Sequence, residues 1–335
     1  MNLVTGGTGL LGSHIVEQLR KRGRAVRALV RPGTDVAWLK SQGVELAEGD
    51  ILDRASLDRA CQGVQCIYHA AARVGDWGPW EDFVRVTING SFNIFDAAES
   101  AGVPRFIHIS SISVYGHVNR PGLVIDETAP LGVNVHRWSY YTRAKVAVEQ
   151  ELWRRHAAGS KVKYTVIRPS WLYGPRDRAT IARLVALIRD GKAKLLGSGD
   201  NRLNVVYAGN VAEACILAAD SPAAVGQAYN CSNDGELTQR QYFNLIASAI
   251  EAPLVTRRIP FKVAYSVAFL LECAGHLFRL KQPPLITRYA VWLMGRQTFF
   301  SAEKARQELE WKSTVGYEEG IPATIQWFDE VSRGG

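Results

Sequence analysis

Short apolar runs alternate with amphipathic stretches through the first half of the chain. Runs typical of buried strands occupy residues 2–5, 26–31, 44–48, 66–69, 106–109 and 164–168. Helical patterns lie between them, one beginning near Leu10 and a long one covering roughly 79–101. Strands separated by helices at this spacing predict right-handed crossovers and a parallel sheet covered on both faces. We therefore predict a doubly wound α/β sheet that binds ligands beyond the carboxyl ends of its strands.

This regular alternation ends after Pro169. Beyond it the pattern predicts three helices, at 177–190, 211–220 and 238–250. It also predicts two short strands, at 204–207 and 228–230. A chain of 335 residues is expected to form one large domain or two closely joined ones. We expect a dinucleotide-binding domain over residues 1–170, with a return segment at about 203–226. A smaller, mostly helical substrate-binding domain is expected over residues 171–202 and 227–335.

The most apolar segment covers residues 263–278 and is interrupted by Glu272 and His276. It is shorter than the roughly 18 residues that a membrane span requires. The favoured interpretation is a core helix that roofs an apolar substrate pocket. The alternative is a helix lying in a membrane interface, because basic residues surround the segment: Lys262, Arg279, Lys281, Arg288 and Arg296.

Composition describes an ordinary folded protein, with 47% hydrophobic and 21% charged residues. The five cysteines include no Cys-x-x-Cys, which suits a reducing compartment and predicts no metal site. A strand that starts at residue 2 leaves no room for a cleavable signal peptide, so a cytoplasmic protein is expected.

The chain has a net charge of +8. It contains no run of Lys and Arg residues with interleaved aromatic residues, the pattern expected of a nucleic-acid-binding protein. An anionic cofactor, substrate or membrane surface would explain the charge equally well.

The first predicted strand ends in a glycine turn. Gly6, Gly9 and Gly12 are three residues apart. This spacing lets the first glycine turn the chain, the second admit a pyrophosphate against bare backbone, and the third pack helix on strand. The following helix offers free N–H groups and a positive dipole end to phosphates. The turn predicts a dinucleotide site, with a plain strand-to-helix connection as the alternative.

Tyr141 and Lys145 are four residues apart in a helical pattern, so both lie on one helix face. An ammonium near a phenol favours the phenolate and lowers a pKa that is otherwise about 10. Tyr141 is therefore a candidate acid/base for carbonyl–alcohol interconversion. Tyr140 is the weaker candidate, because Ala144 lies four residues beyond it.

Serine hydroxyls follow the predicted strand at 106–109, where ligand is expected. One of Ser110, Ser111 and Ser113 could hydrogen-bond and polarise a substrate oxygen. The alternative is a serine that caps the strand end.

Together these motifs resemble the extended short-chain dehydrogenase/reductase superfamily over nearly the whole chain. The motifs are TGGTGLLG at 5–12, Gly49-Asp50-Ile51, His69-Ala70-Ala71-Ala72, Ser110-Ser111-x-x-Val114-Tyr115-Gly116, Tyr141-x-x-x-Lys145 and Arg168-Pro169-x-x-x-Tyr173-Gly174-Pro175. The resemblance implies that Ser111 and Tyr141 are catalytic, and that Lys145 is catalytic and also holds the nicotinamide ribose. One departure is Thr87, which stands where the family commonly carries a supporting asparagine.

The resemblance also implies a set of cofactor contacts. The turn residues Gly6, Thr8, Gly9, Leu10, Leu11 and Gly12 would hold the pyrophosphate, and Asp50 and Ile51 would contact the adenine. Ala70, Ala71 and Ala72 would line the path to the nicotinamide, and Pro169 and Ser170 would flank it. Tyr141 and Lys145 complete the set.

The end of the second predicted strand, Leu29-Val30-Arg31, indicates which cofactor is bound. NAD sites place a carboxylate there for the ribose hydroxyls, whereas an arginine accommodates a 2′-phosphate. The corresponding segment of dihydroflavonol reductases looks similar. NADP(H) is therefore favoured, and the alternative is NAD(H) with Arg31 as a solvated loop charge.

The turn at 72–78 and the tail segments 283–289 and 299–305 resemble the 3β-hydroxysteroid dehydrogenase-like branch, which includes bacterial reductases of 2-alkyl-3-ketoalkanoic acids. This resemblance implies an NADP(H)-dependent oxidoreductase that interconverts a secondary alcohol and a ketone on a lipophilic substrate. A nucleotide-sugar 4-epimerase or dehydratase is an alternative, in which Arg176 and Arg202 would meet a substrate diphosphate. A non-catalytic cofactor-binding or membrane-associated protein is another. The superfamily often dimerises, so a homodimer is expected.

Overall fold

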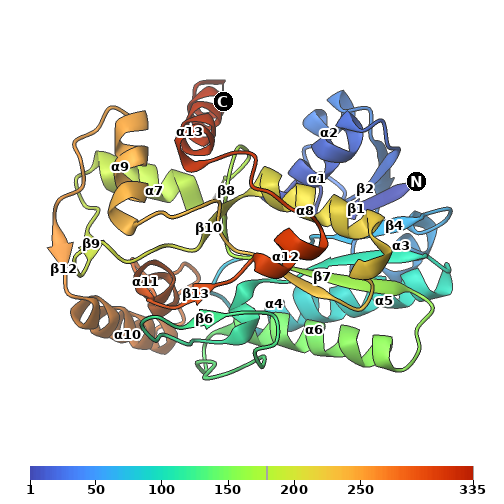
Figure 1. The fold of residues 1–335 in the computed structure, drawn as a ribbon, viewed down its shortest axis with the longest axis horizontal. Coiled ribbons are helices and arrows are strands. Elements are labelled where there is room, and N and C mark those ends of the chain that lie inside the picture. Colours follow the sequence, from blue (N-terminus) through green and yellow to red (C-terminus); the bar gives the residue numbers. More distant parts are fainter. Residues whose placement is uncertain (179, 335) are drawn as a thin grey trace.

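A seven-stranded parallel sheet forms the centre of the computed structural model, which describes residues 1–178 and 180–334 (Figure 1). In sheet order the strands are β11 (Ala228–Cys231), β7 (Lys163–Pro169), β5 (Arg105–Ile109), β4 (Cys66–His69), β1 (Asn2–Thr5), β2 (Val26–Val30) and β3 (Glu45–Glu48). The strand order reverses direction between β1 and β4, and ligands of such sheets bind beyond this switch point. The predicted doubly wound sheet is confirmed.

Helices cover both faces of the sheet. One face carries α1 (Leu10–Lys21) and α8 (Ala208–Asp220), and the other carries α3 (Arg54–Ala60), α5 (Gly90–Ser100) and α6 (Tyr140–Ala157). Neighbouring strand residues point to opposite faces. Thus Val4 packs in the core under α1, whereas Leu3 packs in the core under α5 and α6. This layering leaves the strand ends free to form a site.

The remaining helices and strands lie outside the central sheet and the helices named above. The helices are α2 (Ala37–Ser41), α4 (Trp80–Phe83), the π-helical η1 (Val84–Asn89), the 3-10 helices η2 (Ile112–Tyr115) and η3 (Pro222–Ala224), α7 (Thr180–Arg189), α9 (Gln239–Ala249), α10 (Phe261–Leu277), α11 (Arg288–Gly295), α12 (Glu303–Glu308) and α13 (Tyr317–Gly334). Three parallel strand pairs accompany them, β8 (Trp171–Tyr173) with β10 (Val205–Tyr207), β9 (Leu195–Leu196) with β12 (Arg258–Ile259), and β6 (Val124–Ile125) with β13 (Phe299–Phe300). Helices α7, α9, α10 and α11 gather on one side of the molecule, away from α1 and α2 (Figure 1).

Two predicted elements need correction. The long helix at 79–101 is α4, η1 and α5 in succession, because its middle turn widens into a π-helix. The strand predicted at 228–230 within the substrate-binding part is β11, which pairs with β7 and completes the central sheet. The helix predicted at 177–190 corresponds to α7, and Ala179 within that prediction lies outside the described residues, as does Gly335.

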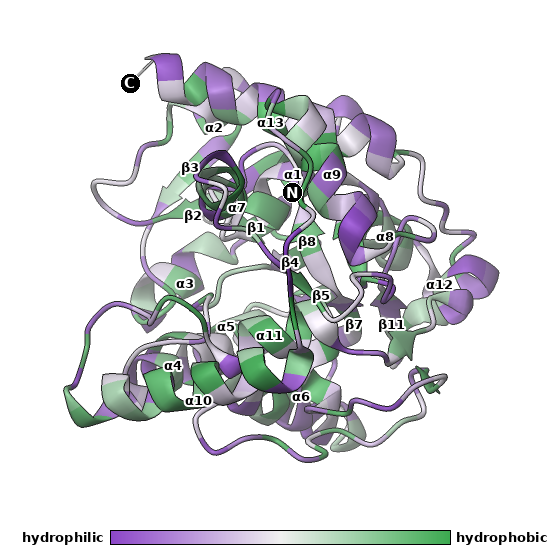
Figure 2. Cartoon of the chain, turned by 90° about the vertical axis from the view of Figure 1, so that its left-hand side faces the viewer, coloured by the Kyte–Doolittle hydropathy of each residue, from purple (hydrophilic) through white to green (hydrophobic). Residues whose placement is uncertain are grey.

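The apolar segment 263–278 corresponds to α10, which is only half buried. Ala264 and Ala268 pack in a small core with α11. The opposite side exposes Val263, Val267 and Leu270, with 49%, 43% and 65% of their surface accessible. Figure 2 shows α10 as a largely hydrophobic ribbon at the edge of the molecule. None of the helices in the described ranges is long and apolar enough to cross a membrane.

Candidate active site

A cleft of about 710 Å³ opens at the carboxyl ends of the central strands. Every residue that the sequence assigned to the site lines this cleft: Gly6, Thr8, Gly9, Leu10, Leu11, Gly12, Arg31, Asp50, Ile51, Ala70, Ala71, Ala72, Ser111, Tyr141, Lys145, Pro169 and Ser170. The fold thus brings together residues from seven separate segments of the chain.

The glycine turn leaves no room for side chains between β1, β4 and α1. Gly6 has a φ of +71°, and a Cβ atom there would lie 2.8 Å from the backbone nitrogen of Ala71. A Cβ atom on Gly12 would lie 2.1 Å from the carbonyl oxygen of Gly6. Gly9 precedes the first residue of α1, whose early N–H groups have no partners within the helix. This bare backbone at a helix N-terminus fits a dinucleotide pyrophosphate.

Tyr141 lies in the first turn of α6, facing Ser111 at the end of β5. Burial raises the pKa of Tyr141, and a hydrogen bond from the Ser111 hydroxyl opposes this rise. The expected lowering of this pKa by Lys145 is not found. The Lys145 ammonium instead donates to the carbonyl oxygen of Ile109 at 2.7 Å. The four-residue spacing placed the two side chains on one helix face but did not fix where the ammonium points.

Lys145 itself is buried, and this burial lowers its pKa to about 8. The carboxylate of Glu149, one turn further along α6, partly opposes this shift. An ammonium with a pKa of about 8 remains mostly protonated at neutral pH. Lys145 can therefore donate hydrogen bonds to hydroxyl oxygens in the cleft.

A buried ion pair beneath the cleft was not predicted. Glu149 on α6 is 0% exposed and Arg168 on β7 is 4% exposed. The Glu149 carboxylate accepts from Arg168 Nε at 3.0 Å, from a second guanidinium nitrogen, and from Ser110 Oγ at 2.6 Å. Arg168 also donates to the hydroxyl of Tyr115 at 2.6 Å. Glu149 lies four residues after Lys145 on the buried face of α6, and this spacing was the signal that sequence reasoning missed.

A second buried network lies around His69, at the end of β4. Its Nδ1 is 2.7 Å from Thr5 Oγ1 and its Nε2 is 3.0 Å from Ser91 Oγ. Burial lowers the pKa of His69 to about 3, so the ring is neutral at physiological pH. Thr87, in the π-helical turn, accepts from Ser91 Oγ at 2.6 Å and from the N–H of Arg73 at 3.1 Å. The threonine that departs from the family pattern thus ties the loop after β4 to the helix behind it.

Helix α11, rather than α10, forms the C-terminal wall of the cleft. Tyr289, Trp292, Leu293 and Arg296 line it, whereas the described lining residues include none from α10. The ring centres of Tyr289 and Tyr141 are 6.5 Å apart. The apolar segment therefore supports the roof from behind instead of forming it, because α10 packs on the outer side of α11.

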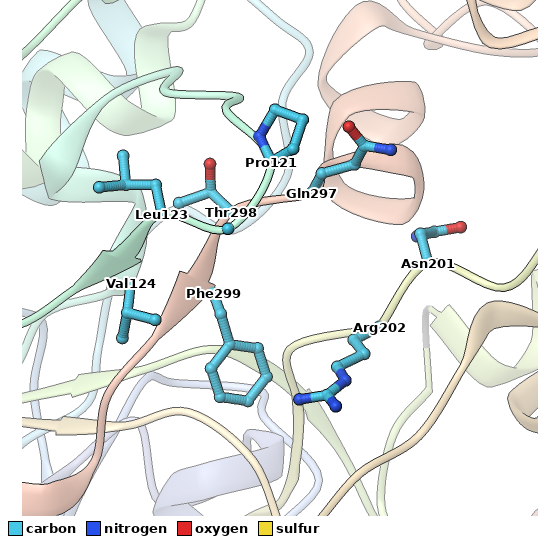
Figure 3. Close-up of a pocket in the computed structure, with 9 residues that line it drawn as sticks. Pro121, Leu123, Val124, Asn201, Arg202, Gln297, Thr298 and Phe299 are labelled. Atoms are coloured by element: carbon cyan, nitrogen blue, oxygen red, sulfur yellow. The ribbon is translucent and has the colours of Figure 1, made fainter.

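The arginines considered for phosphate groups are separated by the fold. Arg31 is exposed at the cleft margin. Arg176 lines the cleft, but its guanidinium pairs with Glu17 at 2.5 Å. Arg202 faces a different hollow of about 330 Å³, shown in Figure 3, and pairs with Glu236 at 2.8 Å. Arg202 therefore does not line the cleft that holds the predicted catalytic residues.

The fold and this cleft define an NAD(P)-dependent oxidoreductase of the short-chain dehydrogenase/reductase type. A model of the NAD dependent epimerase/dehydratase family matches residues 2–232, and the chain belongs to that family.

Two relatives and one solved structure are similar over nearly the whole chain. The 2-alkyl-3-oxoalkanoate reductase of Stenotrophomonas maltophilia is 31% identical, covering 95% of this chain and 96% of the relative. The sterol-4-alpha-carboxylate 3-dehydrogenase, decarboxylating, of Mus musculus is 28% identical, and the match covers 98% of this chain and 91% of the relative. The structure of Thermus thermophilus UDP-glucose 4-epimerase in complex with NAD is 25% identical, with a TM-score of 0.75 and 98% of each chain covered. The resemblance to the 3β-hydroxysteroid dehydrogenase-like branch is confirmed.

Replacing Glu149 with glutamine tests the buried ion pair. Glu149→Gln should lower the free energy of unfolding by about 3–5 kcal/mol, because Arg168 stays buried without its counter-charge. Urea unfolding measures this loss. The control is Glu45→Gln, which removes a half-exposed carboxylate paired with Arg27 and should cost less than about 1 kcal/mol. Equally small losses in both variants would contradict the importance of the buried pair.

Proposed function

We propose that this chain is an NADP(H)-dependent oxidoreductase that interconverts a secondary alcohol and a ketone on a lipophilic substrate. The observation that carries the proposal is the presence of Ser111, Tyr141 and Lys145 in the same cleft as the glycine turn. We further propose that residues 1–170 with 203–226 bind the dinucleotide, and that the remainder, apart from β11, shapes the substrate pocket.

The side chains of the cleft have distinct roles in this proposal. A bound nicotinamide accepts or supplies the hydride. Tyr141 donates a proton to the ketone oxygen in reduction and takes it from the alcohol in oxidation. Ser111 donates a hydrogen bond to the same oxygen, and Lys145 binds the ribose hydroxyls. The raised pKa of Tyr141 keeps the phenol protonated at neutral pH, which is the state that protonation of a ketone oxygen requires.

The names of the two relatives support the substrate class. Each name describes a carbon that carries oxygen beside a carbon that carries a carboxylate, at positions 3 and 2 of the oxoalkanoate and at positions 3 and 4 of the sterol. The aromatic and aliphatic side chains of α11 supply an apolar wall for such a molecule. We therefore propose a substrate of the 3-keto acid or 3β-hydroxysteroid type.

The nucleotide-sugar epimerase alternative has less support from the residues of the cleft. The two arginines considered for a substrate diphosphate are not available to it, because Arg202 lies outside the cleft and Arg176 is paired with Glu17. The overall likeness to a UDP-glucose 4-epimerase keeps this function as the second candidate.

Tyr141→Phe tests the assignment of the proton donor. Turnover should fall by at least about 100-fold, because the general acid is lost, while the affinity for NADPH stays the same. Tyr140→Phe is the matched control, since Tyr140 packs against Trp80 and Phe83 and should leave turnover unchanged. Steady-state kinetics with fluorescence titration of NADPH measures both effects. Retained turnover in Tyr141→Phe would disprove the role.

Arg31→Ala tests the proposed NADP(H) preference. Loss of the guanidinium should weaken NADPH binding by roughly 10- to 100-fold, because a charge-assisted contact to the 2′-phosphate is worth about 1.5–3 kcal/mol. Binding of NADH, which lacks that phosphate, should be unaffected. Fluorescence titration of both cofactors separates the two cases. Equal or tighter NADH binding by the unmodified protein would contradict the preference.

We also propose that the exposed side of α10 contacts an anionic membrane surface from the cytoplasm. Lys262, Arg279 and Lys281 are exposed beside its apolar residues, and such a basic, apolar combination is typical of interfacial helices. Of the other two basic residues that the sequence placed in this group, Arg288 pairs with Glu272 at 2.6 Å and Arg296 is buried. The homodimer implied by the family resemblance stays a prediction.

Liposome flotation tests this surface. The protein should float with vesicles containing phosphatidylserine, and Leu270→Glu should abolish flotation because it places a carboxylate in the apolar contact. Val331→Glu, which alters a similarly exposed valine on α13 with 51% of its surface accessible, is the control and should float normally. Recovery of the unmodified protein in the soluble fraction alone would rule out the membrane contact.

A further inference from the structure

Arg296 is a buried cation in the wall of the cleft. It follows the last residue of α11, is 1% exposed and lines the same cleft as Tyr141. None of its three guanidinium nitrogens has a hydrogen-bond partner within the described part of the chain. The ring centres of Trp292 and Phe300 lie 4.4 Å and 4.8 Å from its Cζ atom. Aromatic packing therefore holds the guanidinium in place, while its N–H donors remain unused.

Each of the other cations that line the cleft has a partner or is exposed to solvent. Lys145 donates to a backbone carbonyl, Arg176 pairs with Glu17, and Arg85 lies 3.4 Å from Asp82. Arg31 and Arg178 are exposed, so water can solvate them. Buried polar groups almost always have partners, and an unpaired buried charge is costly.

The pKa of Arg296 is lowered by burial to about 10, which leaves the side chain charged at neutral pH. A cation that stays charged and buried, with five unused N–H donors, is suited to an anionic partner that enters the cleft. A guanidinium matches a carboxylate particularly well, because its planar fork can donate two parallel hydrogen bonds.

The position of Arg296 relates this anion site to the proposed chemistry. Tyr289, Trp292 and Arg296 are spaced three and four residues apart, so they lie along one side of α11 and its end. All three line the cleft, and Tyr289 is the member of this row whose ring approaches Tyr141. A substrate that extends along this wall from the phenol of Tyr141 would therefore present its next polar group to Arg296.

We propose that Arg296 binds the carboxylate of the substrate, so that the chain acts on 3-oxo or 3-hydroxy carboxylic acids with an apolar tail rather than on neutral ketones and alcohols. This inference rests on the proposed function and names the substrate group that the cleft selects. The glycine turn already provides the cradle for the cofactor pyrophosphate, which leaves Arg296 for the substrate.

Binding of a stable acid and its neutral ester tests the site without turnover. The probes are 3-hydroxydecanoate and methyl 3-hydroxydecanoate, titrated by calorimetry into protein saturated with NADPH. The unmodified protein should bind the acid roughly 100-fold more tightly than the ester, as expected for a buried charged contact. Arg296→Met, which keeps the aromatic packing but removes the charge, should abolish this preference and leave the affinity for the ester unchanged. Arg178→Met removes an exposed arginine of the cleft and should preserve the preference.

Two further measurements separate this role from a purely structural one. Arg296→Met should melt at the same temperature as the unmodified protein or higher, because an unpaired buried charge has been removed. Its affinity for NADPH should also be unchanged. A large fall in the melting temperature, a loss of NADPH affinity, or equal binding of acid and ester by the unmodified protein would overturn the proposal.

The same probes distinguish this inference from the proposed function. Oxidation of 3-hydroxydecanoate with NADP⁺ reports the chemistry, whereas calorimetry reports the anion site. A protein that binds the acid through Arg296 but never oxidises it would refute the proposed function and support the anion site. A protein that oxidises acid and ester equally well, in both the unmodified form and Arg296→Met, would support the function and refute the anion site.

Discussion

The buried ion pair between Glu149 and Arg168 is the constraint on which the geometry of the cleft depends. Two charges with almost no access to water can persist only if their hydrogen bonds are complete. Glu149 meets this condition by accepting from Arg168 on β7 and from Ser110 at the end of β5. The same helix, α6, carries the two residues proposed to bind protons and ribose. The pair therefore fixes α6 against two strands, and with it the distance between Tyr141 and the serine hydroxyls.

Sequence reasoning predicted the features that depend on local rules. The glycine turn follows from backbone sterics within residues 6–12, and the central strands follow from short apolar runs. The direction of the Lys145 ammonium could not be predicted, because its acceptor is a carbonyl 36 residues away. The partners of Glu149 and the burial of Arg296 likewise depend on contacts between distant segments. The apolar pattern at 263–278 predicted a helix, but only the packing of α10 behind α11 shows which helix reaches the cleft.

The family to which the chain belongs includes both epimerases and dehydratases by its description, and the same fold serves net oxidation and reduction in relatives. Fold alone therefore does not decide the reaction. The deciding features lie in the substrate half of the cleft. There, we propose, the aromatic row on α11 and the buried guanidinium of Arg296 bind an apolar acid, whereas Arg176 is paired with Glu17 and Arg202 lies outside the cleft.

The central claim is that the cleft carries out a net reduction or oxidation. The most direct test supplies NADPH with deuterium at the transferable position of the nicotinamide, together with 3-oxodecanoate, and analyses the products by mass spectrometry. The account predicts 3-hydroxydecanoate with deuterium on the carbinol carbon, formed one for one with NADP⁺. An unlabelled alcohol, or an unchanged cofactor accompanied by epimerisation of a UDP-sugar, would contradict it.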